Sequence, residues 1–371
     1  MDGPLATLKV VEFAGLGPAP LAGQMLADMG AEVTVIDRAS APAQAHDVNR
    51  RGKASIALNL KSDHGLHIAK ALINDADVLI EGFRPGVMER LGLGPEACSD
   101  TLIYGRMTGW GQTGPLAHTA GHDITYLAQT GVLSLMATAD APARPPLNLV
   151  ADYGGGTMFL LYGLLSAVIA RGVTGKGQVV DAAMIDGVPA MMGLIHGMMA
   201  SGGWHNPGGN WLDGAAPFYR CYRCADGRDV AVGALEPQFY ELLLQGLGVD
   251  SADLPEQMDR AGWPATSERF AGIFARHHRD HWVEVFAGTD ACVAPVLTLQ
   301  EAAEDAHLGP RGVYVTVDGV QQAAPAPRLS ATPARAITAP TGPGADTHSI
   351  LDRLGYDTAA IEQLRADGVL T

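Results

Sequence analysis

A histidine and an aspartate that could move protons lie at the two ends of one mostly apolar segment. His122 follows Gly121, and Asp152 is followed closely by Gly154–Gly156; glycine lets the main chain approach a ligand closely. Removing a proton beside a carbonyl needs a base on one face of the carbon, and returning it on the other face needs an acid. His122 and Asp152 are the candidates for these roles. Alternatively, Asp152 is the N-cap of the helix predicted over residues 156–170, since aspartate is a favoured N-cap.

The composition and length of the chain indicate a folded, globular protein. Of its 371 residues, 47% are hydrophobic and 18% charged, which is typical of a globular chain, and the length predicts two domains. The formal net charge of −15 disfavours nucleic acid as a partner. Residues 8–13 are too short for a signal sequence, and the apolar run 158–170 is shorter than a bilayer span. We therefore expect a cytoplasmic protein without a membrane span.

The elements that must position His122 and Asp152 begin with a strand, a turn, a helix and a strand. Residues 10–13 and 32–36 are β-type runs around a helical stretch over 21–29, which is a βαβ unit of Rossmann type. Pro20 stands where the dinucleotide fingerprint needs its third glycine, so we do not expect a nicotinamide dinucleotide. Further strands are predicted over residues 55–58, 78–80 and 102–104.

Basic residues are concentrated near the start of this acidic chain. They are Arg38, Arg50, Arg51, Lys53 and Lys61, with Arg84 and Arg90 further on. Such a set can be a solvated face, as charged runs usually are. It can also hold a phosphate-bearing ligand, since guanidinium groups and main-chain N–H groups at strand-to-helix junctions bind phosphate.

Two motifs look like metal sites, but no metal is predicted. Cys221 and Cys224 form a lone pair with no second pair of ligands. On a helix, His277 and His281 would share a face that His278 does not reach. We expect structural roles for both motifs.

Several segments together resemble the CoA-transferase family III, also called the CaiB/BaiF family. These segments are residues 10–15, 83–87, 90–94, 109–115 and 175–181. Within the family, residues 121–123, 148–156 and 233–239 resemble the α-methylacyl-CoA racemase branch. The resemblance runs essentially from end to end, so it does not depend on a single motif.

The resemblance implies an α/β fold with a Rossmann-like large domain built from both chain ends, a smaller α+β domain, and two protomers that interlock as a homodimer. It implies a large CoA-binding domain over residues 1–187 and 328–371 and a small domain over 215–309. Residues 188–214 and 310–327 would be linkers.

The resemblance also implies an acyl-CoA substrate and no other cofactor, with CoA lying on the large domain. The residues implied to bind it are Arg38, Leu58, Asn59, Leu60, Lys61, Gly82, Phe83, Arg84, Arg90, Gly121, Asp123, Ile124, Thr125 and Tyr126.

In the implied reaction, His122 and Asp152 interconvert (R)- and (S)-2-methylacyl-CoA. One removes the α-proton of the thioester, giving an enolate, and the other protonates the opposite face. Asn148 would orient Asp152, and Glu236 of the partner subunit would orient His122. Main-chain N–H groups near residues 121–123, or at a helix start after Asp152, would stabilise the enolate oxygen. A helix start at Asp152 would also favour its ionised form.

Two other functions stay open. In a CoA-transferase, Asp152 would be a nucleophile that moves CoA between carboxylic acids; a histidine at 122 and Ala234-Leu235-Glu236 in place of a glycine run disfavour it. In a non-catalytic acyl-CoA-binding protein, the acid/base set would have no role. The methionines of residues 184–199 either fill the core or form a soft wall for the acyl chain.

Overall fold

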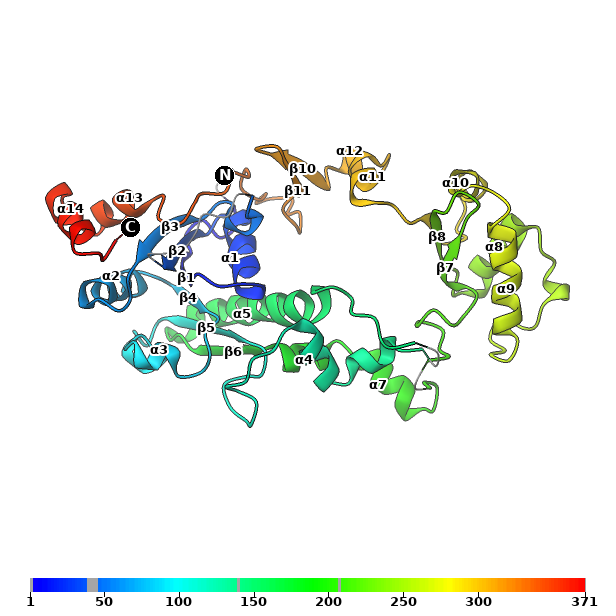
Figure 1. Ribbon diagram of the computed structural model, residues 1–371, viewed down its shortest axis with the longest axis horizontal. Helices are drawn as coiled ribbons and strands as arrows, with labels where there is room; N and C mark the ends of the chain where they lie inside the picture. Colours follow the sequence, from blue (N-terminus) through cyan, green and yellow to red (C-terminus); the bar gives the residue numbers. More distant parts are fainter. Residues whose placement is uncertain (1–2, 39–45, 139–140, 206–207, 371) are drawn as a thin grey trace. The chain divides into compact units, whose positions relative to one another are not determined.

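The computed structural model describes residues 3–38, 46–138, 141–205 and 208–370 and contains two compact units. The first unit comprises residues 1–130, 146–192 and 312–371. The second comprises residues 131–145 and 193–311. Figure 1 shows the elements of both units.

A six-stranded parallel sheet forms the centre of the first unit. Its strands are β1 (Lys9–Phe13), β2 (Glu32–Arg38), β3 (Ala54–Leu58), β4 (Val78–Glu81), β5 (Ile103–Thr108) and β6 (Val179–Ala183). They lie in the order β3-β2-β1-β4-β5-β6. The strand order reverses between β1 and β4, where open α/β sheets bind ligands at the carboxyl ends of the strands. The predicted α/β class and the βαβ opening are confirmed.

Helices cover both faces of this sheet, which explains why its strands are almost continuously apolar. The helices of the first unit are α1 (Pro18–Asp28), α2 (Asp63–Asn74), α3 (Val87–Arg90), α4 (Asp123–Gln129), α5 (Met158–Thr174), α6 (Met184–Ala190), α13 (Thr347–Arg353) and α14 (Thr358–Ala366). Side chains of α2, α13 and α14 share one core with β1 to β5, and these helices lie together in Figure 1. Helices α1 and α5 contact each other and strands of the sheet.

The C-terminal segment joins the edge of the sheet at β3. Asp346 accepts a hydrogen bond through Oδ2 from the N–H of Ser55 (2.9 Å). Leu370 forms an isolated antiparallel bridge with Leu58, and the N–H of Asn59 donates to the carbonyl of Val369 (2.9 Å). The first unit therefore contains both ends of the chain.

Both segments predicted as linkers contain regular structure. Residues 310–327 include an antiparallel hairpin of β10 (Tyr314–Val317) and β11 (Val320–Ala323), which belongs to the first unit. Residues 188–214 include the end of α6 and helix α7 (Gly193–Ala200). The hairpin is held by tertiary contact: Arg51 Nη1 donates to Gln322 Oε1 (2.7 Å) and to the carbonyl of Ala323 (2.8 Å).

The second unit is an α+β arrangement with its own aromatic core. Strands β7 (Tyr219–Arg223), β8 (Asp229–Gly233) and β9 (Val293–Pro295) form an antiparallel sheet in that order. Its helices are α8 (Pro237–Leu247), α9 (Trp263–Phe274), α10 (Arg279–Phe286), α11 (Leu299–Glu304) and α12 (Leu308–Arg311), besides α7. Phe218, Phe270 and Phe274 are fully buried between the sheet and these helices.

Candidate active site

Asp152 lies inside a π-helical segment, Leu149–Thr157, that continues directly into α5. π-Helical structure is rare and often occurs at functional sites. The glycines of the segment let it pack tightly on α6: a Cβ at Gly155 would lie 2.7 Å from Val188, and one at Gly187 would lie 2.0 Å from the carbonyl oxygen of Gly155. The alternative in which Asp152 is a helix N-cap is therefore wrong, because helical structure begins before it.

The carboxylate of Asp152 lies beside the turn that follows β1. A Cβ added to Gly17 would be 3.5 Å from Asp152 Oδ2. Gly17 is in the turn between β1 and α1, so the carboxylate is at the carboxyl end of the sheet, next to the strand where the order reverses. Asn148 Nδ2 donates to the same Oδ2 over 3.5 Å, as the resemblance implies for a residue that orients Asp152.

The half-buried Asp152 holds its proton more tightly than an ordinary aspartate. Burial raises its pKa, and the nearby charge of Asp123 raises it further. The hydrogen bond from Asn148 and the charge of His122 offset part of this rise in pKa. The expectation that a helix start favours ionised Asp152 does not apply, because helical structure begins at Leu149, before this residue.

His122 is exposed at the N-cap position of α4. Its main chain is fixed by Thr125, whose hydroxyl accepts from the N–H of His122 (2.9 Å) and donates to its carbonyl (2.7 Å). Within the described part of the chain, its imidazole makes no hydrogen bond. Its charge acts on Asp152, so the structure places the two predicted acid/base residues near each other. The imidazole is free to meet a ligand.

Asp123 and Tyr126, both predicted to bind CoA, turn their side chains into the protein. Asp123 Oδ2 accepts from the N–H groups of Ala151 and Asp152 (2.8 Å each). Those two N–H groups are thus unavailable to an enolate. Tyr126 packs edge-on against Trp110, with ring centroids 4.8 Å apart. Their neighbours in the same prediction, Ile124 and Thr125, are exposed on α4, and Gly121 is half-buried.

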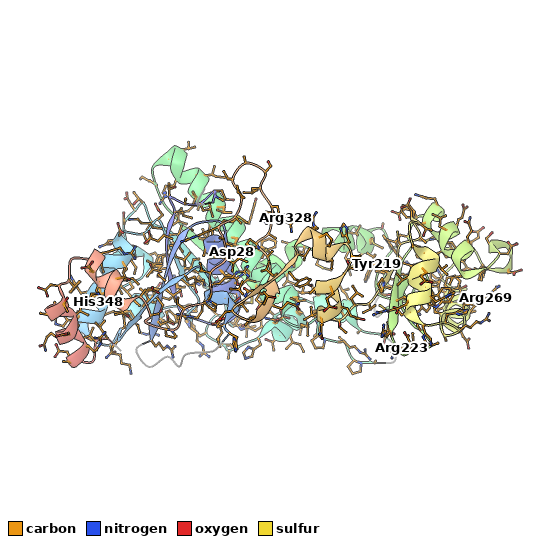
Figure 2. All side chains as sticks on the ribbon, turned by 90° about the horizontal axis from the view of Figure 1, so that it is seen from above. Asp28, Tyr219, Arg223, Arg269, Arg328 and His348 are labelled. Atoms are coloured by element: carbon orange, nitrogen blue, oxygen red, sulfur yellow. The ribbon has the colours of Figure 1, made fainter. Side chains whose placement is uncertain are left out.

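Three of the clustered basic residues are neutralised inside the first unit. Arg50 pairs with Asp37 (2.7 Å), Arg51 with Asp28 (2.6 Å) and Lys53 with Glu12 (2.6 Å). Figure 2 shows Asp28 on α1. These cations are therefore not available to a phosphate, and the hypothesis that they hold a phosphate-bearing ligand is wrong. The alternative of a solvated face is also wrong for Arg51 and Lys53, which are buried.

The other four basic residues are exposed, and the structure shows no ion pair for them among the residues it describes. They are Arg38, Lys61, Arg84 and Arg90. Arg38 ends β2, Lys61 follows β3, and Arg84 follows β4. All three strand ends lie at the carboxyl edge of the parallel sheet. The four cations that the resemblance implies for CoA are thus those that remain free.

Hydrogen bonds of Glu81 and a ring contact of Phe83 fix the loop that carries Arg84. Glu81 accepts through Oε2 from the N–H of Phe83 (2.7 Å), and Arg106 donates to Glu81 Oε1 (2.9 Å). The ring of Phe83 meets Phe13 edge-on, and Gly82 is exposed. This support fixes the direction in which the loop leaves β4.

Residues 58–61, at the end of β3 and directly after it, divide between core and surface. Leu58 is fully buried, and the half-buried Leu60 packs against the core, so neither offers a free side chain to CoA. Asn59 donates through Nδ2 to the carbonyl of Gly368 (3.3 Å) and accepts through Oδ1 from the N–H of Lys61 (3.1 Å). The local main chain is thereby fixed around Lys61.

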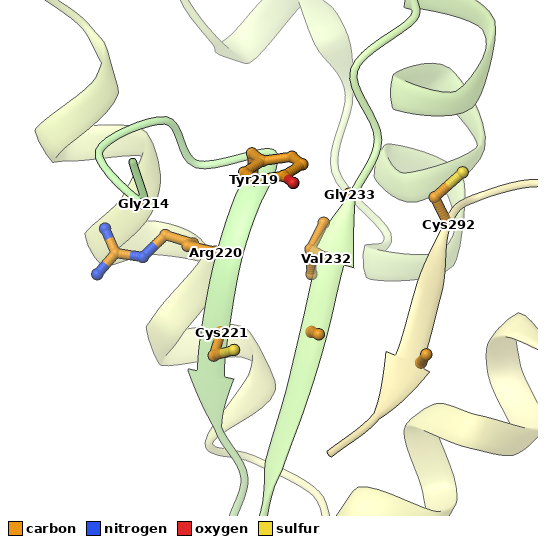
Figure 3. A pocket seen from close by; sticks show the side chains of 9 residues that line it. Gly214, Tyr219, Arg220, Cys221, Val232, Gly233 and Cys292 are labelled. Carbon is orange, nitrogen blue, oxygen red and sulfur yellow. The ribbon is translucent and has the colours of Figure 1, made fainter. Parts of the chain in front are cut away.

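Glu236 belongs to the second unit. It is the exposed N-cap residue of α8, and its carboxylate has no hydrogen-bond partner in the part of the chain that the structure describes. Burial, and then the charge of Glu236, raise the pKa of Cys292. Cys292 lines a hollow of about 660 Å³ over the sheet of this unit, together with Tyr219, Arg220 and Cys221 (Figure 3).

The cysteine pair and the histidine cluster both lie in the second unit. All four cysteines are free, with Cys221 exposed and Cys224 buried. The rings of His277 and His281 stack with centroids 4.0 Å apart. Across residues 3–38, 46–138, 141–205 and 208–370 there is no group of three side chains suited to a metal. Of the methionines, Met184 is buried, whereas Met191 and Met199 are exposed, so core packing does not explain them all.

Sequence reasoning missed two features of the site: the role of Gly17 and the bonds made by Asp123. Gly17 had a signal in the Gly15-Leu16-Gly17-Pro18 turn, but its proximity to Asp152 comes only from the fold. Nothing in the sequence indicated that the side chain of Asp123 binds the main chain at Ala151 and Asp152, because an acidic residue in the first turn of a helix is common.

Comparison with known proteins covers nearly the whole chain. A family model described as CoA-transferase family III matches residues 5–349. Alpha-methylacyl-CoA racemases of Mus musculus and Homo sapiens are 44% and 43% identical to it, over 99% of this chain and 97% of theirs. A crystal structure of a CAIB/BAIF family protein from Brucella suis has a TM-score of 0.79 at 25% identity, covering 95% of this chain and 100% of that one.

Proposed function

The chain belongs to CoA-transferase family III, and we propose that it is an isomerase that interconverts (R)- and (S)-2-methylacyl-CoA by proton transfer through an enolate. The observation that carries this proposal is the pairing of an exposed, unbonded imidazole on His122 with the half-buried carboxylate of Asp152. Relatives named alpha-methylacyl-CoA racemase support it over almost their full length. CoA is part of the substrate, and both steps need only acid/base groups, so we propose no further cofactor.

The two groups divide the proton transfers. For one enantiomer Asp152 removes the α-proton and His122 protonates the opposite face; for the other enantiomer the roles exchange. General acid–base catalysis is most efficient when the pKa of the group lies near the working pH. The raised pKa of Asp152 moves it in that direction. It becomes a stronger base when ionised and is more readily reprotonated.

The enolate oxygen needs hydrogen-bond donors where its charge develops. The N–H groups of Ala151 and Asp152 are already bound to Asp123. By contrast, the N–H groups of Asp123 and Ile124, at the start of α4, have no partner among the residues that the structure describes. These two groups lie directly after His122, which supports their use for the thioester oxygen.

For CoA, we propose contact with the four free cations Arg38, Lys61, Arg84 and Arg90. Their exposure and lack of ion pairs among the described residues support this. Guanidinium groups bind phosphate oxygens in pairs, and the carboxyl edge of an open sheet is the usual place for a nucleotide. Gly82 and Phe83 would add main-chain and ring contacts.

An apolar stripe on α5 supports the proposed homodimer. Its exposed residues follow helical spacing on one face: Met158, Tyr162, Leu165, Ile169 and Val173. Tyr162 is 73% exposed, Ile169 72% and Val173 86%. The continuous helix over residues 149–174 also has the length and apolar composition of a membrane span, features that core helices of soluble proteins share. We propose that a second copy covers this stripe and that Glu236 of the partner subunit orients His122.

Proton NMR in D₂O tests the reaction directly. The purified protein is incubated with (R)-2-methylacyl-CoA, alone and with a free carboxylic acid as acceptor. Loss of the α-proton signal with inversion at C2, without an acceptor, supports the racemase; His122→Ala and Asp152→Ala should then each abolish it. CoA transfer to the acid with the α-proton unchanged would instead identify a CoA-transferase with Asp152 as nucleophile. Binding without either change would identify an acyl-CoA-binding protein.

A further inference from the structure

Asp123 joins the two acid/base residues through hydrogen bonds to the main chain. Its side chain is 6% exposed, and Oδ2 accepts from the N–H groups of Ala151 and Asp152 at 2.8 Å each. Hydrogen bonds to an ionised carboxylate are stronger than neutral ones. Because Asp123 directly follows His122, these two bonds connect the start of α4 to the π-helical segment at Asp152.

Burying the carboxylate of Asp123 to make this connection costs free energy. Burying a charge is unfavourable unless it is paired, and Asp123 has no cation partner among the residues that the structure describes. Its second oxygen, Oδ1, is also buried and has no hydrogen-bond partner in that part of the chain. A neutral amide could accept the same two N–H groups at lower cost. What the carboxylate adds to these two hydrogen bonds is its charge, which acts on Asp152.

We propose, on the basis of the proposed racemase reaction, that Asp123 is a positioning residue that holds Asp152 at a fixed place relative to His122. The two groups must reach opposite faces of one α-carbon, so their separation has to be constant through both proton transfers. An error of about 1 Å in such a placement can lower the rate by about 100-fold. Hydrogen bonds to two consecutive main-chain N–H groups fix the position of the Asp152 backbone more strictly than one bond would.

The charge of Asp123 has a second consequence for Asp152. After burial, it is the largest cause of the raised pKa of Asp152. The elements packed against the π-helical segment carry several charged or titratable groups. They are His122 at the N-cap of α4, Asp123 and Tyr126 of α4, Asp186 of α6, Asp28 of α1, Tyr162 and Arg171 of α5, and Asp181 of β6. Asp28 and Arg171 are engaged in ion pairs, and Asp186 acts on Asp181. The charges that act on Asp152 are those of Asp123 and His122.

Two substitutions separate the hydrogen bonds from the charge. Asp123→Ala removes both, whereas Asp123→Asn keeps one oxygen that can accept from both N–H groups. Asp186→Asn is the control, because it removes an exposed carboxylate on another helix packed against the same segment. For each variant, kcat, KM and the pH profile of α-proton exchange are measured. Amide hydrogen exchange at Ala151 and Asp152 is followed in parallel.

We expect Asp123→Ala to lower kcat by about 100-fold with little change in KM, and to speed amide exchange at Ala151 and Asp152. Asp123→Asn should recover most of kcat and keep both amides protected. In this variant, the limb of the pH profile that reports ionisation of Asp152 should also move to lower pH, because the neighbouring negative charge is gone. Asp186→Asn should resemble the wild type in all three measurements.

Several outcomes would overturn the inference. In one such outcome, Asp123→Ala has the same kcat as the wild type, and the wild type exchanges the α-proton. The positioning role of Asp123 would then be rejected, and the proposed racemase function would be kept. In another, the main-chain amides of Ala151 and Asp152 exchange fast in Asp123→Asn, or the limb of its pH profile that reports Asp152 stays in place. These measurements on Asp123→Asn test the inference even if Asp123→Ala does not fold. Absence of α-proton exchange in the wild type would reject the proposed function together with the inference.

Discussion

The carboxylate of Asp152 lies against the turn at Gly17, where a Cβ would be 3.5 Å from Asp152 Oδ2. Gly17 has φ 75°, a backbone conformation that L side chains rarely adopt. The turn after the first strand therefore combines an unusual backbone with a close approach to the proposed catalytic carboxylate.

Gly17→Ala should lower both stability and activity. The backbone strain should cost about 1–3 kcal/mol of unfolding free energy, and relief of this strain should shift the turn that lies beside Asp152. Chemical denaturation and α-proton exchange measure the two effects. The matched control is Gly172→Ala in α5, where a Cβ meets nothing within 4 Å and alanine favours the helix. Equal stability of the two variants would contradict the argument from strain.

Asn148→Ala should raise the pKa of Asp152 further. The hydrogen bond from Asn148 lowers that pKa in the wild type, so its loss favours the protonated acid. For the enantiomer whose α-proton Asp152 removes, the acidic limb of kcat/KM should move to higher pH. Asn148→Gln keeps an amide as the comparison. A limb that stays in place would show that the 3.5 Å contact has no electrostatic effect.

Lys53→Met should destabilise the first unit strongly. Lys53 and Glu12 are both buried and 2.6 Å apart, so removing the cation leaves an unpaired buried carboxylate, at a cost of about 3–5 kcal/mol. The double variant Lys53→Met with Glu12→Leu should recover most of this lost stability, because both buried charges are then absent. Urea unfolding of the two variants checks this expectation, and equal stability of single and double variants would refute it.

Arg84→Ala should raise KM for acyl-CoA roughly tenfold with little change in kcat, since one charge-assisted hydrogen bond to phosphate contributes about 1.5–3 kcal/mol. The remaining binding should depend less on salt concentration. Arg50→Ala provides the contrast: it removes an internal ion pair with Asp37, so it should lower stability and leave KM largely unchanged. Similar rises in KM for both variants would reject the separation into free and paired cations.

Much of the sheet could be predicted from the sequence, because a strand buried on both faces has a local apolar signature. Val78–Ile80 and Val10–Phe13 are such runs, and both are strands in the structure. The hairpin over residues 314–323 had no such pattern, since its residues are mostly exposed or half-buried and its position depends on Arg51.

The candidate site was predictable in residue type but not in environment. Asn148 donates a hydrogen bond to Asp152, and the charge of His122 acts on Asp152. That Arg50 and Arg51 are neutralised could not be predicted, because their partners Asp37 and Asp28 come near them only through the parallel sheet and α1. The sign of the pKa shift at Asp152 likewise depends on burial and on Asp123, which are properties of the fold.

The pairing of Leu58 with Leu370 has a consequence for the growing polypeptide on the ribosome. All six strands of the sheet have been synthesised once Ala183 emerges, yet the outer edge of β3 waits for residues 346–370. An open strand edge is a template for pairing with other chains. While the second unit is being translated, the nascent first unit therefore carries an aggregation-prone edge, and chaperone protection during this interval would determine the yield of folded enzyme.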